Sequence, residues 1–251
     1  DDMMLSASAE GSGTLDNPGP AGSGTSPFSS VRIADGVEIH GRKYGQSVQF
    51  VSESRHELDF DDDKFNFNKD TLGFTLSIWA KRFHPYSASK DGVASADGYN
   101  ADAVGQHDPN SSHNLIGRGQ TSNSYGITYN QAGNSISAGV RGLGGGAATT
   151  QETITHTMPD DLLDWHHIAF TFQSGSSTGL KLYVDGVLEG QNTTLGANYK
   201  ISGSNDFSAS NYATEPLTVG GNEIVGGNNV HFSGFLQYPR VYDRTLDADE
   251  I

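Results

Sequence analysis

The feature that most constrains this chain is strict two-residue alternation of apolar side chains within short segments. The segment 74–80 places Phe74, Leu76 and Ile78 on one face, and Trp79 on the other. Trp79 is therefore expected to face a second packed layer or a ligand. No long apolar stripe with a helical period of 3.6 residues occurs in the sequence, so the fold is predicted to be all-β with minor helix.

Further short segments of the same texture predict strands separated by turns rich in Gly and Asn. These segments are 31–39, 48–50, 58–60, 115–118, 125–129, 135–140, 153–157, 165–172, 180–184, 217–221, 232–236 and 239–242. Asp185-Gly186 predicts a tight hairpin, because both residue types tolerate positive φ. A last helical turn is expected near Asp247.

The sequence predicts a linker followed by a single domain. Residues 1–30 are dominated by Gly, Ser, Ala, Pro and Asp and are typical of a flexible linker, whereas residues 31–251 are expected to form one β-sandwich. The polar tract 84–114 supplies no core strand, and a connection of that length is often functional. No apolar run is long enough to span a bilayer and no signal peptide opens the sequence, which suggests a mature form or a piece of a larger multidomain protein.

Charge and cysteine content exclude several partners. With 15 basic and 30 acidic residues, the net charge of −15 opposes binding of nucleic acid or an anionic membrane. Without cysteine, neither disulfides nor a thiolate metal site is available. This combination is typical of secreted and surface proteins of bacteria, so we expect an extracellular or cell-surface location.

The order of the motifs adds a resemblance to a known family. Segments 74–80, 165–172, 180–188, 217–221 and 232–251 resemble, in this order, the laminin-G-like jelly roll of the concanavalin-A-like lectin and glucanase superfamily, as found in large bacterial surface adhesins. The resemblance implies a two-sheet antiparallel β-sandwich covering roughly residue 41 to the C-terminus. Gln237-Tyr238 departs from the family, which usually has Asp-Glu there. The fold hosts lectins, adhesive modules, accessory domains and hydrolases.

Calcium is the predicted cofactor, because loop carboxylates suit a hard cation. Acidic residues gather in three clusters. The favoured cluster lies in the long polar tract and consists of Asp91, Asp97, Asp102 and Asp108. The alternatives are the cluster Asp59, Asp61, Asp62 and Asp63 and the cluster Asp160, Asp161 and Asp164.

A ligand site is expected where two loops converge at one rim of the sandwich. Asn supplies directional hydrogen bonds to sugar hydroxyls, and Tyr supplies a stacking face, so the site suits a glycan or a short peptide terminus. The candidate residues are Tyr86, Tyr99, Asn110, His113, Asn222, Asn228 and Asn229. Each of these is also an ordinary loop residue, and Asn in particular is a common turn former.

A catalytic reading rests on Glu57, Asp59 and Asp61, whose spacing is similar to the acidic strand of laminarinase-type glucanases. The shorter Asp61 would widen the carboxylate separation, so no catalytic residue is predicted. His166 and His167 point to opposite faces of a strand and cannot easily share one metal ion, and Trp165 is expected to anchor the core.

Together these observations predict a non-catalytic, calcium-dependent recognition or adhesion module that binds glycans on a cell or matrix surface. The alternatives are a β-glucanase on the same fold, a peptide-binding domain and a structural spacer of an adhesin.

Overall fold

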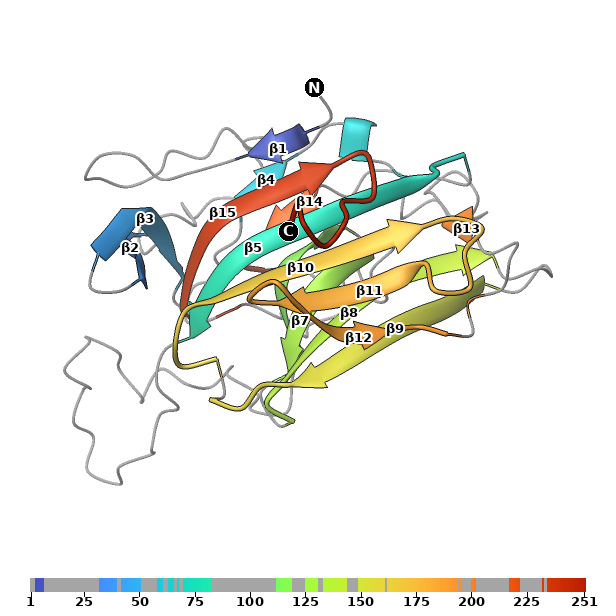
Figure 1. The fold of residues 1–251 in the computed structure, drawn as a ribbon. Coiled ribbons are helices and arrows are strands. Elements are labelled where there is room, and N and C mark those ends of the chain that lie inside the picture. The colour runs from blue at the N-terminus through green and yellow to red at the C-terminus, as the bar shows by residue number, and fades with distance from the viewer. Residues whose placement is uncertain are drawn as a thin grey trace.

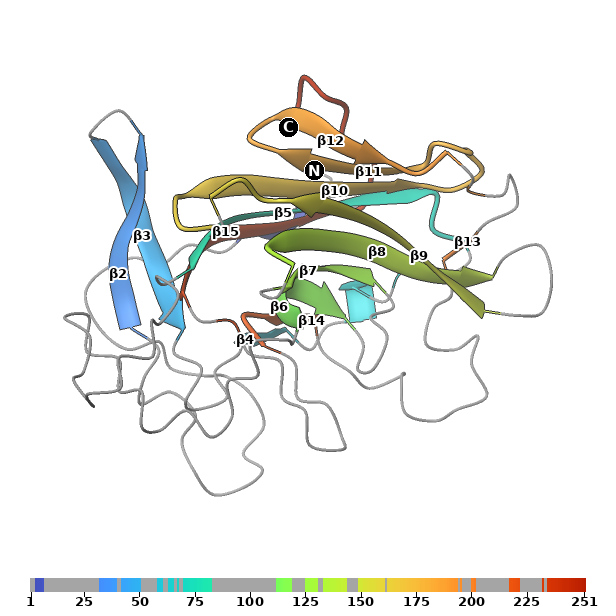
Figure 2. The same cartoon turned by 90° about the horizontal axis from the view of Figure 1, so that it is seen from below.

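The computed structural model describes residues 3–6, 32–39, 42–50, 58–60, 63–65, 67, 70–82, 112–118, 125–130, 133–143, 149–160, 162–193, 195, 200–201, 217–221, 232 and 234–251. These residues form two antiparallel sheets that face each other, one above the other in the view of Figure 2. Among them, the one helical element is a 3-10 turn, η2 (Asp63–Phe65). The predicted all-β sandwich is confirmed.

Sheet A has eight strands in the order β12-β11-β10-β5-β15-β3-β2, and β1 also pairs with β15. Its strands are β1 (Met3–Ser6), β2 (Arg32–Ile39), β3 (Arg42–Phe50), β5 (Gly73–Arg82), β10 (His166–Gln173), β11 (Leu180–Val184), β12 (Val187–Gln191) and β15 (Gly234–Tyr242). Figure 1 shows β10, β5 and β15 side by side at its centre. β1 lies within the segment that composition assigned to a linker.

Sheet B has seven strands in the order β13-β8-β7-β6-β14-β4, with β9 paired to β8. Its strands are β4 (Leu58–Phe60), β6 (Ser112–Arg118), β7 (Tyr125–Asn130), β8 (Ser135–Leu143), β9 (Thr149–Thr157), β13 (Lys200–Ile201) and β14 (Leu217–Val219).

The core lies between the sheets, and an aromatic cluster is at its centre. Phe74 has no exposed surface, and its ring stacks on Phe67 at a centroid distance of 4.6 Å. Tyr125 approaches the same ring at 5.1 Å and donates a hydrogen bond from its hydroxyl to the carbonyl of Phe65 at 2.7 Å. Burial raises the pKa of the Tyr125 phenol, so the hydroxyl remains a neutral donor.

Trp165 does not anchor this core, contrary to the sequence-based expectation. The inward positions of β10 belong to Ile168 and Phe170, both fully buried. Trp165 has the opposite parity, so it lies with His167 on the outer face of sheet A, half-buried with its ring 6.2 Å from that of Phe235.

The predicted Asp185-Gly186 hairpin is confirmed. The turn joins β11 to β12, and Asp185 and Gly186 have φ values of 52° and 78°. Positive φ at both central residues gives the twist that two antiparallel strands need. The turn therefore holds the Asp185 carboxylate beside the start of β10.

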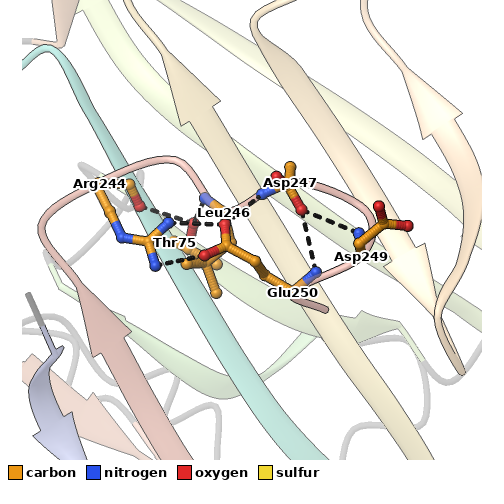
Figure 3. Close-up of polar contacts among 6 residues, drawn as sticks. All are labelled: Thr75, Arg244, Leu246, Asp247, Asp249 and Glu250. Carbon is orange, nitrogen blue, oxygen red and sulfur yellow. Dashed lines mark hydrogen bonds and ion pairs between the residues drawn. The ribbon is translucent and has the colours of Figure 1, made fainter.

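The C-terminal residues form a hydrogen-bonded turn over 247–250 rather than a regular helix. Figure 3 shows Asp247 Oδ1 accepting from the backbone N of Asp249 and Glu250, at 3.0 and 3.1 Å. The Glu250 carboxylate in turn accepts from Asp247 N at 3.0 Å and from the Arg244 guanidinium at 2.7 and 2.6 Å. The reciprocal bonds of Asp247 and Glu250 resemble a capping box.

Thr75 attaches this turn to the outer face of sheet A. Its Oγ1 donates to the carbonyl of Arg244 and accepts from the backbone N of Leu246, both at 2.9 Å (Figure 3). Thr245 makes a second attachment by donating to the carbonyl of Phe172 on β10. The turn thus covers the half of the outer face that is distant from Arg82.

We expect Thr75→Val to lower the free energy of unfolding by about 2 kcal/mol, because it leaves a buried donor and acceptor unpaired. Thr153→Val is the matched control, since Thr153 is exposed on β9. Urea unfolding of both variants measures the difference. Equal stability of the two variants would show that Thr75 does not hold the turn.

Candidate ligand-binding site

Four of the six chain crossings between the sheets lie at one end of the sandwich. The connections β3–β4, β5–β6, β9–β10 and β14–β15 all pass from one sheet to the other at this end. We call it the loop rim and define it by Arg82, Ser112, Asn130, Thr157 and Gly221. In jelly rolls, loops grouped at one end of a rigid scaffold are common binding regions.

Asn114 joins the start of β6, which follows the β5–β6 crossing, to the end of β14, which precedes the β14–β15 crossing. Its Nδ2 donates to Thr218 Oγ1 at 2.9 Å and to the carbonyl of Gly221 at 2.8 Å. β6 starts at Ser112 and antiparallel β14 ends at Val219, so the tract that precedes β6 and the segment that follows Gly221 adjoin the same part of the rim. These are the two regions predicted from the sequence to form the ligand site.

The other oxygen of Asn114 is unusual. Asn114 is 1% exposed, and its Oδ1 is buried without accepting a hydrogen bond from any described residue. A side chain at Gly117 would place its Cβ 3.0 Å from this oxygen, so glycine keeps the space beside it open. Such a buried acceptor can bind an ordered water molecule.

Of the predicted ligand residues, the structure describes His113. It lies on β6 opposite Tyr129 and is 5% exposed, so it supports the rim from within. The remaining candidates lie outside the described residues: Tyr86, Tyr99, Asn110, Asn222, Asn228 and Asn229.

Arg82 stands where the long tract leaves β5. Its guanidinium lies 5.6 Å from the centroid of the Tyr129 ring, and its backbone N donates to the carbonyl of Leu162 at 2.8 Å. Burial lowers the pKa of Arg82 and raises that of Tyr129. The pair connects the two sheets at the rim through a cation–π contact.

His166 is clamped between two carboxylates at the same end. Its Nδ1 lies 2.7 Å from Asp185 Oδ2, and its Nε2 lies 2.9 Å from Asp160 Oδ2. The hydrogen bond to Asp185 and then that to Asp160 raise the pKa of His166 to about 9, against the opposing effect of burial. At neutral pH the ring is an imidazolium that donates from both nitrogens. The sequence pattern of His166-His167 gave no sign of these partners.

The same clamp occupies one of the predicted calcium clusters. Asp160 accepts from the backbone N of Leu162 at 3.1 Å and of Asp164 at 2.9 Å, in addition to His166. Within the described part of the chain, no three His, Cys, Asp or Glu residues are grouped to hold a metal ion. The favoured calcium residues, Asp91, Asp97, Asp102 and Asp108, lie outside that part, as do Asp61, Asp62 and Asp161.

The acidic strand considered for catalysis is short. β4 spans Leu58–Phe60, with Leu58 and Phe60 packed against the core and Asp59 opposite Thr218. Glu57 and Asp61 lie outside the described residues.

The chain belongs to the concanavalin A-like lectin/glucanases superfamily, whose sequence profile matches residues 54–251. The jelly-roll fold and the motif order at β5, β10, β11, β14 and β15 agree with this assignment. No curated protein matches the chain in sequence.

Solved structures share the fold at low identity. The binding domain of Paraclostridial Mosquitocidal Protein 1 is 13% identical, with a TM-score of 0.56 over 99% of this chain and 50% of that chain. The receptor-binding domain of botulinum neurotoxin type G is 14% identical, with a TM-score of 0.50 over 100% of this chain and 50% of that one. The chain thus spans half the length of each.

The described part of the chain contains no helix whose length and apolarity would suffice to cross a membrane.

Proposed function

We propose that this chain is a non-catalytic, extracellular recognition module that binds glycans at the loop rim. The observation that carries the proposal is the hydrogen bond from Asn114 to Gly221, which joins the strand ends that lead to the two segments containing the predicted ligand residues. The family and the fold of the toxin binding domains support a binding role.

Calcium dependence is a further part of the proposal. The four aspartates of the favoured cluster fall within the tract that connects Arg82 to Ser112, and both of these residues are at the rim. A calcium ion held by loop carboxylates would fix the tract over the site. A weak single site would gain strength from display on a multidomain surface adhesin.

A glycan array probed with and without a calcium chelator tests both parts. We expect binding that chelation weakens at least tenfold, and the same loss in a variant with Asp91, Asp97, Asp102 and Asp108 changed to Asn. Asp243→Asn is the control, because Asp243 is exposed, follows the end of β15 that lies away from the rim, and belongs to none of the predicted clusters. Binding that is unaffected by chelation would reject the calcium requirement. Absence of binding in both conditions would reject the glycan site.

The superfamily also includes glucanases, so hydrolysis is tested directly. We expect no release of reducing ends from β-glucans by the purified chain. Release that Glu57→Gln abolishes would replace the recognition proposal by a hydrolase.

A further inference from the structure

β15 contains a bulge that decides which side chains reach the outer face of sheet A. Gln237 pairs with Trp79 and Arg240 pairs with Ser77, so β15 has one more residue than β5 between these pairs. Tyr238 has φ of 49°, a left-handed conformation that a residue with a bulky side chain rarely adopts. The extra residue keeps both Gln237 and Arg240 outward, whereas strict alternation would turn one of them inward.

Arg240 is a cation without an anion within the described part of the chain. Its Cζ lies 5.7 Å from the centroid of the Tyr238 ring, and its Nε is buried with no hydrogen-bond acceptor there. In a chain with 30 acidic and 15 basic residues, an arginine that contacts a tyrosine ring instead of a carboxylate is notable. A guanidinium presents a planar set of donors that matches a carboxylate.

Further aromatic rings lie on the same outer face as this cation. The Trp79 ring lies 5.3 Å from that of His167, and the Trp165 ring lies 6.2 Å from that of Phe235. All these side chains are half-buried on the outer face, on the half of sheet A that lies nearest Arg82 and away from the C-terminal turn. We call this surface the aromatic patch; its members are Trp79, Trp165, His167, Phe235, Tyr238 and Arg240.

We propose that the aromatic patch is a second binding site, distinct from the loop rim, for a sugar that carries a carboxylate group. Arg240 would bind the carboxylate, and the neighbouring rings would stack on the apolar face of the sugar. A neutral sugar would leave the cation unpaired.

The sheet geometry favours a sugar over an extended peptide. β5 is hydrogen-bonded to β10 and β15 on its two sides, and β15 is bonded to β5 as well as to β3 and β1. The backbone beneath the patch therefore offers no free strand edge to which a peptide could add. The groups that remain for recognition are flat ring faces, the Arg240 guanidinium, and the side chains of Lys81 and Gln237, which the pairing of β5 and β15 places on the same face.

Tryptophan fluorescence reports on this surface selectively. The chain has two tryptophans, Trp79 and Trp165, and both belong to the patch. The proposed contacts are made by a protein cation, so binding here requires no calcium. The patch and the rim can thus be measured separately.

The experiment titrates the full chain, in the presence of a calcium chelator, with a short oligogalacturonate and with its methyl ester. We expect the acid to change the tryptophan fluorescence and to bind at least tenfold more tightly than the ester, which keeps the sugar rings but lacks the charge. Arg240→Gln should weaken binding of the acid at least tenfold, and Arg240→Lys should weaken it less. Lys181→Gln, on β11 of the same sheet, removes an equal charge outside the patch and should change binding less than twofold.

Tyr238→Glu provides a variant that retains Arg240. It supplies a carboxylate of the chain itself beside the guanidinium, so it should compete with the sugar and weaken binding. Thermal unfolding checks that every variant is folded.

Equal affinity for the acid and its ester, unchanged binding by Arg240→Gln, or no fluorescence response would overturn the proposal. Equally tight binding of a short peptide with a free C-terminal carboxylate would overturn the assignment to a sugar. None of these outcomes depends on whether the rim binds a glycan in calcium.

Discussion

Replacing Phe74 by alanine is expected to lower the free energy of unfolding by about 4 kcal/mol, the range observed when a large aromatic side chain is removed from a core. Phe74 is fully buried and contacts four aromatic rings, those of Phe67, Tyr125, Phe170 and Phe172, at centroid distances of 4.6, 5.1, 6.0 and 5.5 Å. These rings come from both sheets and from the segment before β5, so a cavity there cannot close by moving one strand.

Urea unfolding followed by tryptophan fluorescence measures this loss. Leu72→Ala is the control, because Leu72 lies two residues away and is 81% exposed. We expect it to change the free energy of unfolding by less than ~0.5 kcal/mol, as is usual for exposed positions. A Phe74→Ala variant as stable as the control would contradict the packing described for the core.

The His166 clamp makes stability depend on pH. The pKa of His166 is raised from 6.5 to about 9 in the folded chain, so folding is favoured most when the ring is protonated. This contribution is fully present below pH 6.5 and is lost as the pH rises through 9, because a neutral ring donates from one nitrogen and leaves the other facing a carboxylate. We expect a loss on the order of 2 kcal/mol, less than the full shift implies because the Asp185 side chain is partly exposed.

The carboxylates act in the opposite pH range. Hydrogen bonds from His166 and backbone amides lower the pKa of Asp160 and Asp185 despite the opposing effect of burial. Their contribution is present above the ordinary aspartate pKa and is lost as the pH falls below it. The clamp is therefore strongest between about pH 4 and pH 6.5.

Unfolding of the wild type and His166→Asn across this range tests the clamp. The difference in the free energy of unfolding between them should be larger at pH 6 than at pH 10. His167→Asn is a useful contrast, because burial and the nearby Arg240 lower the pKa of His167. The stability that neutral His167 contributes is present at high pH. It is lost as the pH falls below 6.5, because the unfolded chain then binds a proton at this residue more readily than the folded chain. Parallel pH profiles for the wild type and His166→Asn would contradict the clamp.

The sequence by itself determined the sandwich, most of its strands and the family. Alternation in 74–80 and 165–172 is a local property that a pleated strand converts directly into a buried and an outer face, and Asp185-Gly186 carries its turn geometry in two adjacent residues. The ordered motifs led to the superfamily that the profile match shows. The same parity rule, applied to Trp165, would have placed it with His167 outside the core.

Tertiary structure alone decided which distant groups meet. Asn114 and Gly221 are 107 residues apart, and they are joined because β6 and β14 pair. His166 contacts Asp160 and Asp185 because the β9–β10 crossing and the β11–β12 turn both end beside the start of β10. Segments 232–236 and 239–242, predicted as two strands, form one strand whose bulge turns Arg240 outward. Pairing register and a left-handed tyrosine are set by contacts between strands, so no local pattern could have indicated them.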